Sequence, residues 1–196
     1  MTSVPEVGAA KSAVRARHLA RRHARPQADR DTAAAAVSAA LVRGLAGTRT
    51  LAAYVPAPEE PGHGRLPAAF AELGARVLLP VVPAEGAELR WAVDTGRLAP
   101  GRYGLYEPVG PRLGPAAVGT VDVVVVPALA VSRNGVRLGR GGGYYDRALR
   151  HVRPDAVLVA VVFDDELLED LPVEPHDRQV TAVVTPSGGW ERLPGP

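Results

Sequence analysis

The sequence predicts one α/β domain built on a mainly parallel sheet whose two faces are both covered. Helix-like and strand-like segments alternate along the 196 residues, as they do where helices connect parallel strands. Nearly continuous apolar runs at 123–131 and 156–163 are typical of strands buried on both faces. No internal repeat or low-complexity linker divides the chain. We therefore expect residues 1–196 to form a single domain with loose ends at 1–8 and 187–196.

The N-terminal segment from Lys11 to Arg25 has the spacing of a helix, which Pro26 should end. A solvated basic surface is the simplest interpretation of its polar face. A second helix should follow, capped by Asp31 or Thr32 and running to about Ala46. The polar face of the first helix is formed by Lys11, Arg15, His18 and Arg22.

The first strand is expected at 50–55, and the proline-rich loop 56–62 leaves its carboxyl end. Ligands bind at this edge of open α/β sheets, so the loop is a candidate binding segment. Otherwise its glutamates are ordinary solvated charges. The remaining elements follow in order: a helix at 66–73, strands at 76–82 and 89–93, a strand at 123–131, an Asn134-Gly135 turn into a strand at 136–138, a helix at 144–152, and strands at 156–163 and 180–185.

The motif Arg137-Leu138-Gly139-Arg140-Gly141-Gly142-Gly143-Tyr144-Tyr145-Asp146 joins a strand to a helix. Glycines let a backbone approach a ligand closely, and free N–H groups at a helix start attract an anion. Arg137 and Arg140 add fork-shaped donors for phosphate oxygens. Asp146, in the first helical turn, is placed to hold a magnesium ion bridging those oxygens. The motif therefore predicts a phosphate-binding loop.

Plainer interpretations of this motif stay open. Glycine runs are often only flexible turns, and an aspartate in a first helical turn is favourable without a metal. The motif also departs from two standard patterns. It has no Gly-Lys-Ser/Thr ending, so it is not a P-loop, and Gly139-x-Gly141-x-x-Tyr144 lacks the third glycine of the dinucleotide-binding fingerprint.

The run from Asp122 to Leu149, with its Val-Pro-Ala-Leu-Ala start and its Arg-Leu-Gly-Arg-Gly-Gly-Gly-Tyr-Tyr-Asp-Arg core, resembles the signature of the 5-formyltetrahydrofolate cyclo-ligases, also called methenyltetrahydrofolate synthetases. The resemblance implies the three-layer fold shared with phosphosugar isomerase-like and CoA-transferase-like proteins. It also implies an ATP-dependent enzyme that cyclises 5-formyltetrahydrofolate to 5,10-methenyltetrahydrofolate through a phosphorylated formyl intermediate, releasing ADP and phosphate. The implied cofactors are ATP and Mg²⁺, and the implied small-molecule partner is a reduced folate.

The resemblance assigns roles residue by residue. Lys11 and Arg15 match an N-terminal Lys-x-x-x-Arg that contributes to the family's ATP site, and Lys11 is the only lysine in the chain. Together with Arg137 and Arg140, Lys11 is the expected catalytic set, and Asp146 is the expected metal ligand. The expected nucleotide-binding residues are Lys11, Arg15, Arg137, Leu138, Gly139, Arg140, Gly141, Gly142, Gly143, Tyr144 and Tyr145.

On the folate side, Glu60 aligns with the family's glutamate after Tyr-x-Pro, with Glu59 as the fallback. The segment 101–108 resembles the part of the family chain that approaches the pterin pocket, where Tyr103 or Tyr106 could stack on the ring. The expected substrate-binding residues are Val55, Glu60, Arg140, Gly141, Gly142, Gly143 and Tyr144.

Two positions depart from the family pattern. His63 stands where a threonine is common, and Thr181 stands where many relatives carry an aspartate that serves the metal. Either Asp146 and the nucleotide phosphates suffice for magnesium, or Asp177 or a water replaces that aspartate. These departures leave open a respecialised or non-catalytic relative that binds another ligand.

Composition limits the remaining classes. The chain is 46% apolar and has no cysteine, which excludes wholesale disorder, a disulfide framework and thiolate chemistry. No apolar run reaches the roughly 18 residues of a membrane span, and no signal-peptide hydrophobic region is present, so we expect a cytoplasmic protein without a membrane partner. We also expect a monomer or weak homodimer.

Residues 1–30 hold seven cationic and only two acidic side chains, while the formal net charge of the whole chain is only +2 and the sequence pI is about 9.3. A modest net charge without an aromatic-studded basic sheet is a weak footprint for nucleic acid. We therefore expect no nucleic-acid partner. A small RNA-binding protein that uses the basic N-terminal helix is the rival from another class.

Overall fold

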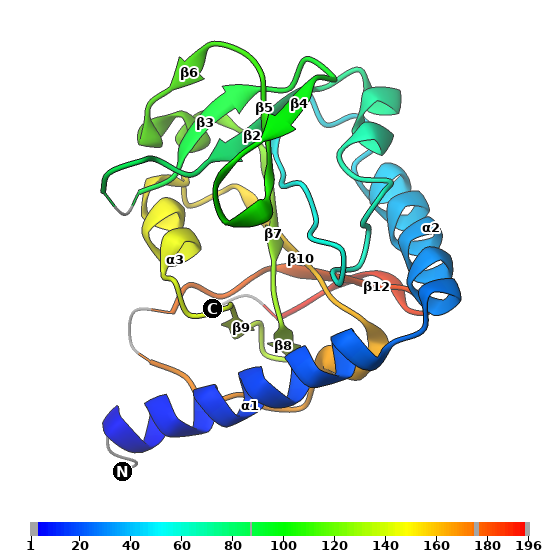
Figure 1. Ribbon diagram of the computed structural model, residues 1–196, viewed down its shortest axis with the longest axis vertical. Helices are drawn as coiled ribbons and strands as arrows, with labels where there is room; N and C mark the ends of the chain where they lie inside the picture. Colours follow the sequence, from blue (N-terminus) through cyan, green and yellow to red (C-terminus); the bar gives the residue numbers. More distant parts are fainter. Residues whose placement is uncertain (1–3, 87, 175–176, 195–196) are drawn as a thin grey trace.

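The computed structural model describes residues 4–86, 88–174 and 177–194. Over these residues, eight strands form one large sheet in the order β13-β12-β10-β7-β1-β2-β3-β6 (Figure 1). The central strands β12, β10, β7, β1 and β2 lie parallel, and the edge strands are antiparallel. The predicted mainly parallel sheet is confirmed. Its strands are β1 (Thr50–Ala52), β2 (Arg76–Val81), β3 (Arg90–Val93), β6 (Arg112–Leu113), β7 (Val123–Pro127), β10 (Val157–Val161), β12 (Ala182–Thr185) and β13 (Gly189–Arg192).

The apolar runs form central strands because both faces of the sheet are buried. Successive side chains of a strand point to opposite faces. In β7, Val124 and Val126 join one core cluster while Val125 joins the other. A strand between two apolar layers has no solvent-facing side, so it carries no polar alternation.

Helices cover each face of the sheet and give three layers (Figure 1). On one face lie α2 (Gln27–Gly44) and the 3₁₀ helix η1 (Ala68–Leu73). On the other lies α3 (Tyr144–Ala148). Two 3₁₀ helices, η3 (Pro115–Thr120) and η4 (Leu149–His151), pack beside α3. The three-layer α/β prediction is therefore confirmed.

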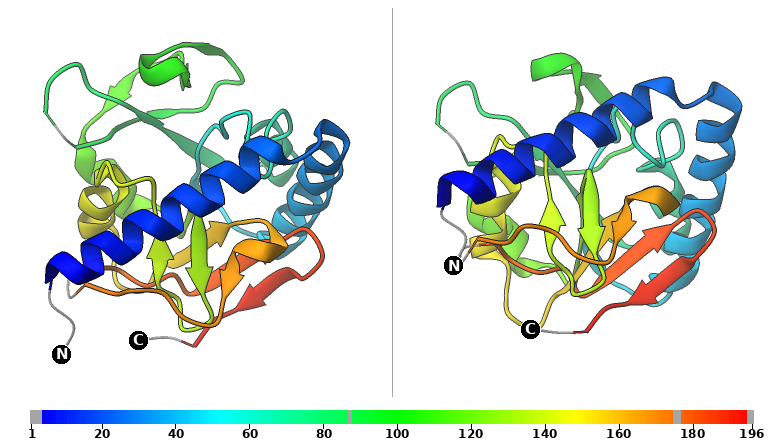
Figure 2. Two further views of the ribbon diagram at one scale, coloured as in Figure 1. Left: turned by 60° about the horizontal axis from the view of Figure 1, so that its bottom comes forward. Right: turned by 90° about the horizontal axis from the view of Figure 1, so that it is seen from below.

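A long helix and a small separate sheet lie outside the three layers. Helix α1 (Val4–Ala24) crosses this sheet, as the two views of Figure 2 show. Val14 of α1 packs on the cluster that includes Leu138 and Leu171. The small sheet consists of β8 (Ala130–Ser132), β9 (Arg137–Leu138) and β11 (Leu167–Leu168), and β11 follows the 3₁₀ helix η5 (Asp164–Glu166).

The apolar run 123–131, predicted as one strand, is instead two. β7 ends at Pro127, and the chain then enters β8 of the small sheet. The predicted turn at Asn134-Gly135 is confirmed between β8 and β9, where Gly135 has φ +88°. The Gly135 amide donates to the Ser132 carbonyl at 2.8 Å. This is a three-residue hairpin loop that needs a positive φ only at its glycine.

The expected loose ends are partly wrong. Helix α1 already begins at Val4, and β13 pairs with β12 in the region predicted as a tail. Trp190 of β13 packs so closely on α2 that a Cβ at Gly44 would lie 2.3 Å from its ring. Sheet pairing and this contact order a segment whose local composition suggests a tail. Residues 1–3 and 195–196 lie outside the described residues.

The predicted cap of the second helix is also wrong. Helix α2 begins at Gln27, directly after Pro26, and no side chain caps it. Thr32 sits within the helix, where its hydroxyl donates to the Ala28 carbonyl at 2.9 Å. Pro26 is the N-cap residue of α2, with φ −58° and ψ 149°, and because proline cannot continue a helix it ends α1 directly before α2 begins.

A hairpin of β4 (Leu98–Pro100) and β5 (Tyr106–Pro108) projects from the sheet on the side of β2 (Figure 1). The short 3₁₀ helix η2 (Arg102–Gly104) forms its tip, and Tyr103 there has φ +56°. A positive φ is unusual for a residue other than glycine. The hairpin tip faces the cavity described next.

Candidate functional site

A cavity of about 460 Å³ opens beyond the carboxyl ends of β1, β2 and β7. Its walls come from segments far apart in the chain. They are the loop after β1, the β4–β5 hairpin, the glycine loop between β9 and α3, and the first turn of α3. The polar residues around it include Glu59, Glu60, Glu107, Arg137, Arg140 and Asp146. This is the edge of an open α/β sheet at which ligands bind.

The glycine loop takes a backbone conformation that other residues avoid. Gly141 has φ +97° and Gly143 has φ +68°. The Arg15 guanidinium, from α1, donates through Nε to the Gly139 carbonyl at 3.0 Å. The predicted helix at 144–152 is confirmed in part: α3 has five α-helical residues and the chain continues directly as the 3₁₀ helix η4 to His151, so the α-helical dipole behind the loop is short. Any anion binding must come mainly from the loop and its arginines.

Arg137 is buried at the floor of the loop and lines the cavity. Its Nη2 donates to Asp146 Oδ1, and its Nη1 lies 3.4 Å from the Pro127 carbonyl. Its buried Nε has no hydrogen-bond partner among the described residues. Burial lowers the pKa of Arg137, and the Asp146 carboxylate opposes this by favouring the charged form. A buried cation with an open N–H group beside a cavity suits an anionic ligand.

Arg140 links the glycine loop to the loop after β1. Its Nη2 donates to Glu59 at 2.7 Å and to Glu60 Oε1 at 3.2 Å. Burial would raise the pKa of Glu59, but the hydrogen bond and charge of Arg140, together with a backbone hydrogen bond and the charge of His23, lower it. Glu60 is the more fixed carboxylate, because its Oε2 also accepts from the Ala57 amide at 3.0 Å. Both candidates for the folate glutamate therefore line the same cavity.

Tyrosines flank the cavity at two depths. Tyr103 and Tyr106 are 71% and 56% exposed on the hairpin, and the Tyr103 hydroxyl lies 3.5 Å from that of Tyr144 across the opening. Deeper, the hydroxyls of Tyr54 and Tyr145 are buried without a hydrogen-bond partner among the described residues. Burial raises the pKa of both phenols. The cavity thus offers aromatic surface near its mouth and unpaired hydroxyls below.

Lys11 does not line the cavity. It is 4% exposed, and its Nζ lies 2.7 Å from Glu174 and 2.6 Å from Asp177. Burial would lower the Lys11 pKa, but these two carboxylates together raise it. Arg15 reaches the glycine loop only from behind, and Leu138 is buried in the small sheet. The expected site residues that do line the cavity are Val55, Glu60, Arg137, Gly139, Arg140, Gly141, Gly142, Gly143, Tyr144, Tyr145 and Asp146.

The donor set fits a magnesium ion only in part. No group of three or more His, Cys, Asp or Glu among the described residues could hold a metal ion. Asp146 is one carboxylate, half taken by Arg137, so a hard cation here would need oxygens from a ligand and water. Thr181 is bonded to the backbone of Leu158, and His63 to the Pro56 carbonyl. His176, which precedes Asp177 in the chain, lies outside the described residues.

The predicted solvated face of the first helix is wrong. His18 and Arg22 are completely buried, as is the Glu166 carboxylate that Arg22 binds. The spacing showed a shared face but not that this face packs inward. Glu107 also lines the cavity but was not predicted to do so. The resemblance of segment 101–108 to the family segment near the pterin pocket could have identified it. Glu107 accepts a hydrogen bond from the Val82 amide at 3.0 Å.

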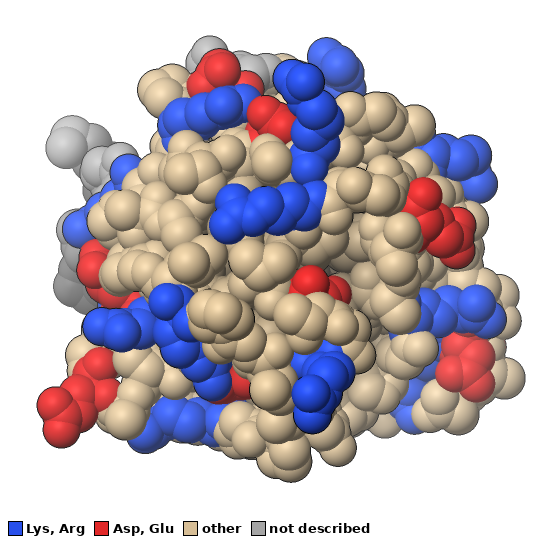
Figure 3. Space-filling view, turned by 90° about the horizontal axis from the view of Figure 1, so that it is seen from above, with Lys and Arg blue, Asp and Glu red and all other residues tan. Residues whose placement is uncertain are grey.

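Several cations of the basic helix are bound to acceptors elsewhere in the fold, whereas Arg17 and Arg21 are exposed. Lys11, Arg15, Arg22 and Arg25 all reach acceptors on other elements. On the opposite face, arginines and carboxylates are interspersed (Figure 3). Neither feature favours an RNA surface, which needs a continuous basic stripe. Among the described residues, no helix is both long enough and apolar enough to cross a membrane.

Comparisons with known proteins agree with this picture. The model of the 5-formyltetrahydrofolate cyclo-ligase family matches residues 7–186. A 5-formyltetrahydrofolate cyclo-ligase of Mycolicibacterium smegmatis is 45% identical over 184 residues, which are 91% of this chain and 95% of the relative. One from Escherichia coli is 37% identical over 124 residues, or 60% of this chain and 67% of the relative.

Two solved structures are similar in fold. The NMR structure of Aquifex aeolicus 5,10-methenyltetrahydrofolate synthetase matches with a TM-score of 0.78 and 29% identity, covering 95% of this chain and 94% of that chain. A 5,10-methenyltetrahydrofolate synthetase from Mycoplasma pneumoniae matches with a TM-score of 0.71 over 88% of this chain and 96% of that chain. Its identity of 20% supports the fold alone.

Proposed function

The chain belongs to the 5-formyltetrahydrofolate cyclo-ligase family, and we propose that it uses ATP to cyclise 5-formyltetrahydrofolate to 5,10-methenyltetrahydrofolate. One observation carries the proposal beyond family membership. A single cavity brings Glu60, the expected folate contact, beside Arg140 and the glycine loop, the expected phosphate contacts. Two substrates that react with each other must meet in one site.

The chain's own groups would act mainly by orientation and charge. Arg137 and Arg140 present guanidinium groups to the cavity, which suits oxygens of a transferring phosphoryl group. Glycines at 139, 141, 142 and 143 carry no side chain, so the loop backbone can approach a phosphate closely, and at 139 and 143 the space of a Cβ is taken by the guanidinium groups of Arg137 and Arg147. ATP, bound with magnesium near Asp146, would supply the phosphoryl group and help neutralise its charge.

The chemistry then needs no protein nucleophile. The formyl oxygen of the folate would bond to the γ-phosphorus as the bond to ADP breaks, giving a phosphorylated formyl group. The neighbouring secondary amine would attack the formyl carbon and lose its proton, and phosphate would leave with the former formyl oxygen. Glu60 would hold the folate while Tyr103, Tyr106 and Tyr144 close around it.

The direct test is the growth of methenyl-folate absorbance when the protein, Mg-ATP and 5-formyltetrahydrofolate are mixed. We expect growth that requires all three components and one ADP released per methenyl group. An Arg140→Met variant should fold and lose most of this activity. No growth at micromolar wild-type protein, with reduced folate still bound, would instead favour the respecialised relative.

A further inference from the structure

Arg22 is a completely buried cation at the carboxyl-terminal part of α1. Its Nε and Nη2 bind the two oxygens of Glu166 at 2.6 and 2.7 Å. Nη2 also donates to the Ala128 carbonyl at 2.6 Å, just beyond β7. Burial would lower the Arg22 pKa, but the hydrogen bond and charge of Glu166, together with the charges of Glu60 and Tyr54, raise it. Three acceptor contacts therefore fix the guanidinium plane.

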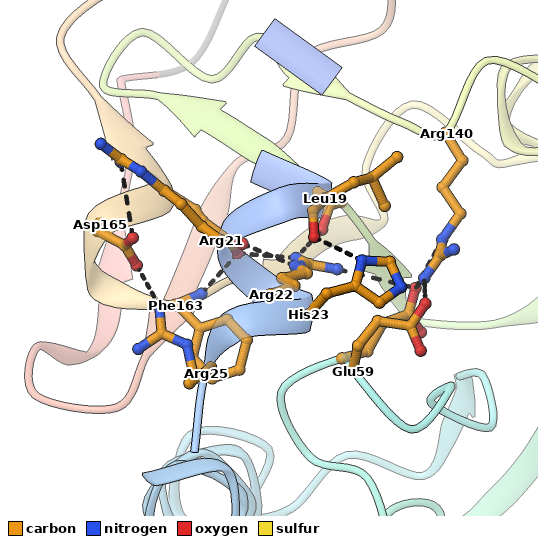
Figure 4. Close-up of polar contacts among 12 residues, drawn as sticks. Leu19, Arg21, Arg22, His23, Arg25, Glu59, Arg140, Phe163 and Asp165 are labelled. Atoms are coloured by element: carbon orange, nitrogen blue, oxygen red, sulfur yellow. Dashed lines mark hydrogen bonds and ion pairs between the residues drawn. The ribbon is translucent and has the colours of Figure 1, made fainter. Parts of the chain in front are cut away.

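The remaining nitrogen of Arg22 points elsewhere. Nη1 is buried, has no hydrogen-bond partner among the described residues, and lies 3.9 Å from Glu60 Oε1. Figure 4 shows Arg22 between two pairs: Arg25 with Asp165 on one side, and Arg140 with Glu59 on the other. Arg22 therefore lies between the buried Glu166 carboxylate and Glu60, which lines the cavity.

Glu60 has a second cationic neighbour, Arg140, but that residue is not committed to it. The Arg140 side chain is 45% exposed and divides its donors between Glu59 and Glu60. The proposed function requires Arg140 to bind phosphate oxygens as well. When Arg140 turns to phosphate, Glu60 keeps only the cation that cannot leave, because Arg22 is fixed by Glu166.

We infer that the buried Arg22–Glu166 pair positions Glu60 and keeps its carboxylate oriented toward the folate while Arg140 serves the nucleotide. The inference rests on the proposed function. Arg22 does not line the cavity, so it acts on the folate only through Glu60. A buried charge pair is a poor source of net stability, which is consistent with its retention for orientation.

The design of the test follows from the cost of unpaired buried charges. Changing Arg22 alone would leave Glu166 uncompensated and could unfold the protein. The double variant Arg22→Met with Glu166→Gln removes both charges together, and the glutamine oxygen can still accept from the Phe163 amide. The matched control is Arg25→Met. Arg25 directly follows α1, and its Cζ lies 4.0 Å from the centre of the Phe163 ring, which Arg22 also faces at 5.7 Å. Its carboxylate partner, however, is the surface residue Asp165.

Calorimetry on the full chain would measure dissociation constants for 5-formyltetrahydrofolate and for Mg-ATP separately. For the double variant we expect folate binding to weaken about 10- to 100-fold, the range of one charged contact, with Mg-ATP within about twofold of wild type. Arg25→Met should leave both constants unchanged. Arg22→Lys, which keeps the charge, should recover part of the folate affinity.

The outcomes separate the two hypotheses. Unchanged folate affinity in a folded double variant overturns the role of Arg22, and so does an equal loss for folate and Mg-ATP, which would indicate a general structural effect. If the wild-type protein itself binds no 5-formyltetrahydrofolate, the proposed function fails first.

Discussion

Lys11 on α1 holds Asp177 through an ion pair of 2.6 Å that spans 166 positions of the chain. Glu174 shares the same ammonium, and neither carboxylate is more than 26% exposed. The expected ATP-site lysine therefore links the first helix to the segment before β12 through these two ion pairs. A phosphate ligand for Lys11 would have to compete with these two carboxylates.

This contact sharpens a prediction for Lys11. We expect bound ATP to draw the Lys11 ammonium from these carboxylates to its phosphate oxygens, so Lys11→Arg should lower turnover about tenfold, because a planar fork cannot replace a compact ammonium there. Lys11→Ala should lower it by roughly 10² to 10³, the effect of removing one charge-stabilising donor. Steady-state kinetics at saturating folate, with melting temperatures, measure both.

The control for Lys11 is Glu174→Gln, which weakens the same ion pair and leaves the ammonium in place. It should lower the melting temperature while keeping turnover near wild type. Wild-type turnover in Lys11→Arg would mean that Lys11 serves only the structural ion pairs with Glu174 and Asp177.

The glycine loop can be tested by its backbone conformation. Gly141→Ala places a side chain at φ +97°, which costs about 1 kcal/mol of stability. Gly47→Ala carries the same penalty at φ +81° in open space after α2. We expect similar losses of stability in the two variants, but a raised KM for ATP only in Gly141→Ala. Equal KM values would reduce the loop to an ordinary turn.

Asp146 can be tested as a magnesium ligand. Asp146→Asn keeps an oxygen for Arg137 but loses the charge that favours a hard cation. We expect half-maximal activity to need about tenfold more magnesium, which corresponds to a loss of about 1.4 kcal/mol in magnesium binding. Asp122→Asn also removes a carboxylate paired with an arginine, Arg153, and should leave the magnesium titration unchanged. An unaltered titration in Asp146→Asn removes it from the metal site.

His18 predicts a pH dependence of folding. Burial, aided by the positive charges of Arg17, Arg21 and Arg22 and opposed by Asp165, lowers its pKa below 6.5. Below about pH 6.5 the unfolded chain binds a proton at His18 that the folded protein does not bind, so the free energy of unfolding falls as the pH drops. At neutral pH both states are unprotonated and the effect disappears.

The measurement is urea unfolding between about pH 7.5 and pH 5.5, where one such proton contributes a slope of up to about 1.4 kcal/mol per pH unit. His18→Leu removes the titrating group and keeps an apolar side chain in the buried site. We expect a shallower slope in the variant than in the wild type. Parallel slopes would show that His18 does not couple protonation to folding.

Local sequence was a reliable guide to the sheet interior and to the central motif. A strand buried on both faces must be apolar throughout, so the pattern around Val124 and Val159 predicts it without knowledge of its neighbours. The turn at Gly135 and the positive φ at Gly141 depend on the missing Cβ of the residue itself. The resemblance carried by the same motif led to the family.

Segments whose structure depends on distant partners were predicted poorly. Residues 189–192 become a strand only because β12 offers a pairing edge and α2 a surface for Trp190. The run 123–131 divides because its second half pairs with β9 and β11 rather than continuing in the large sheet. Neither partner can be identified from the segment itself.

The α/β class, the buried strands and the glycine loop could be predicted from local sequence, because apolar patterning and backbone freedom are properties of the local chain. The buried face of α1 could not, because it depends on a partner from another part of the fold. Arg22 looks like a surface cation in sequence, and it is buried because Glu166, 144 residues away, compensates its charge there. A long charged side chain can lie either in water or in the interior, and the partner across the fold decides between them.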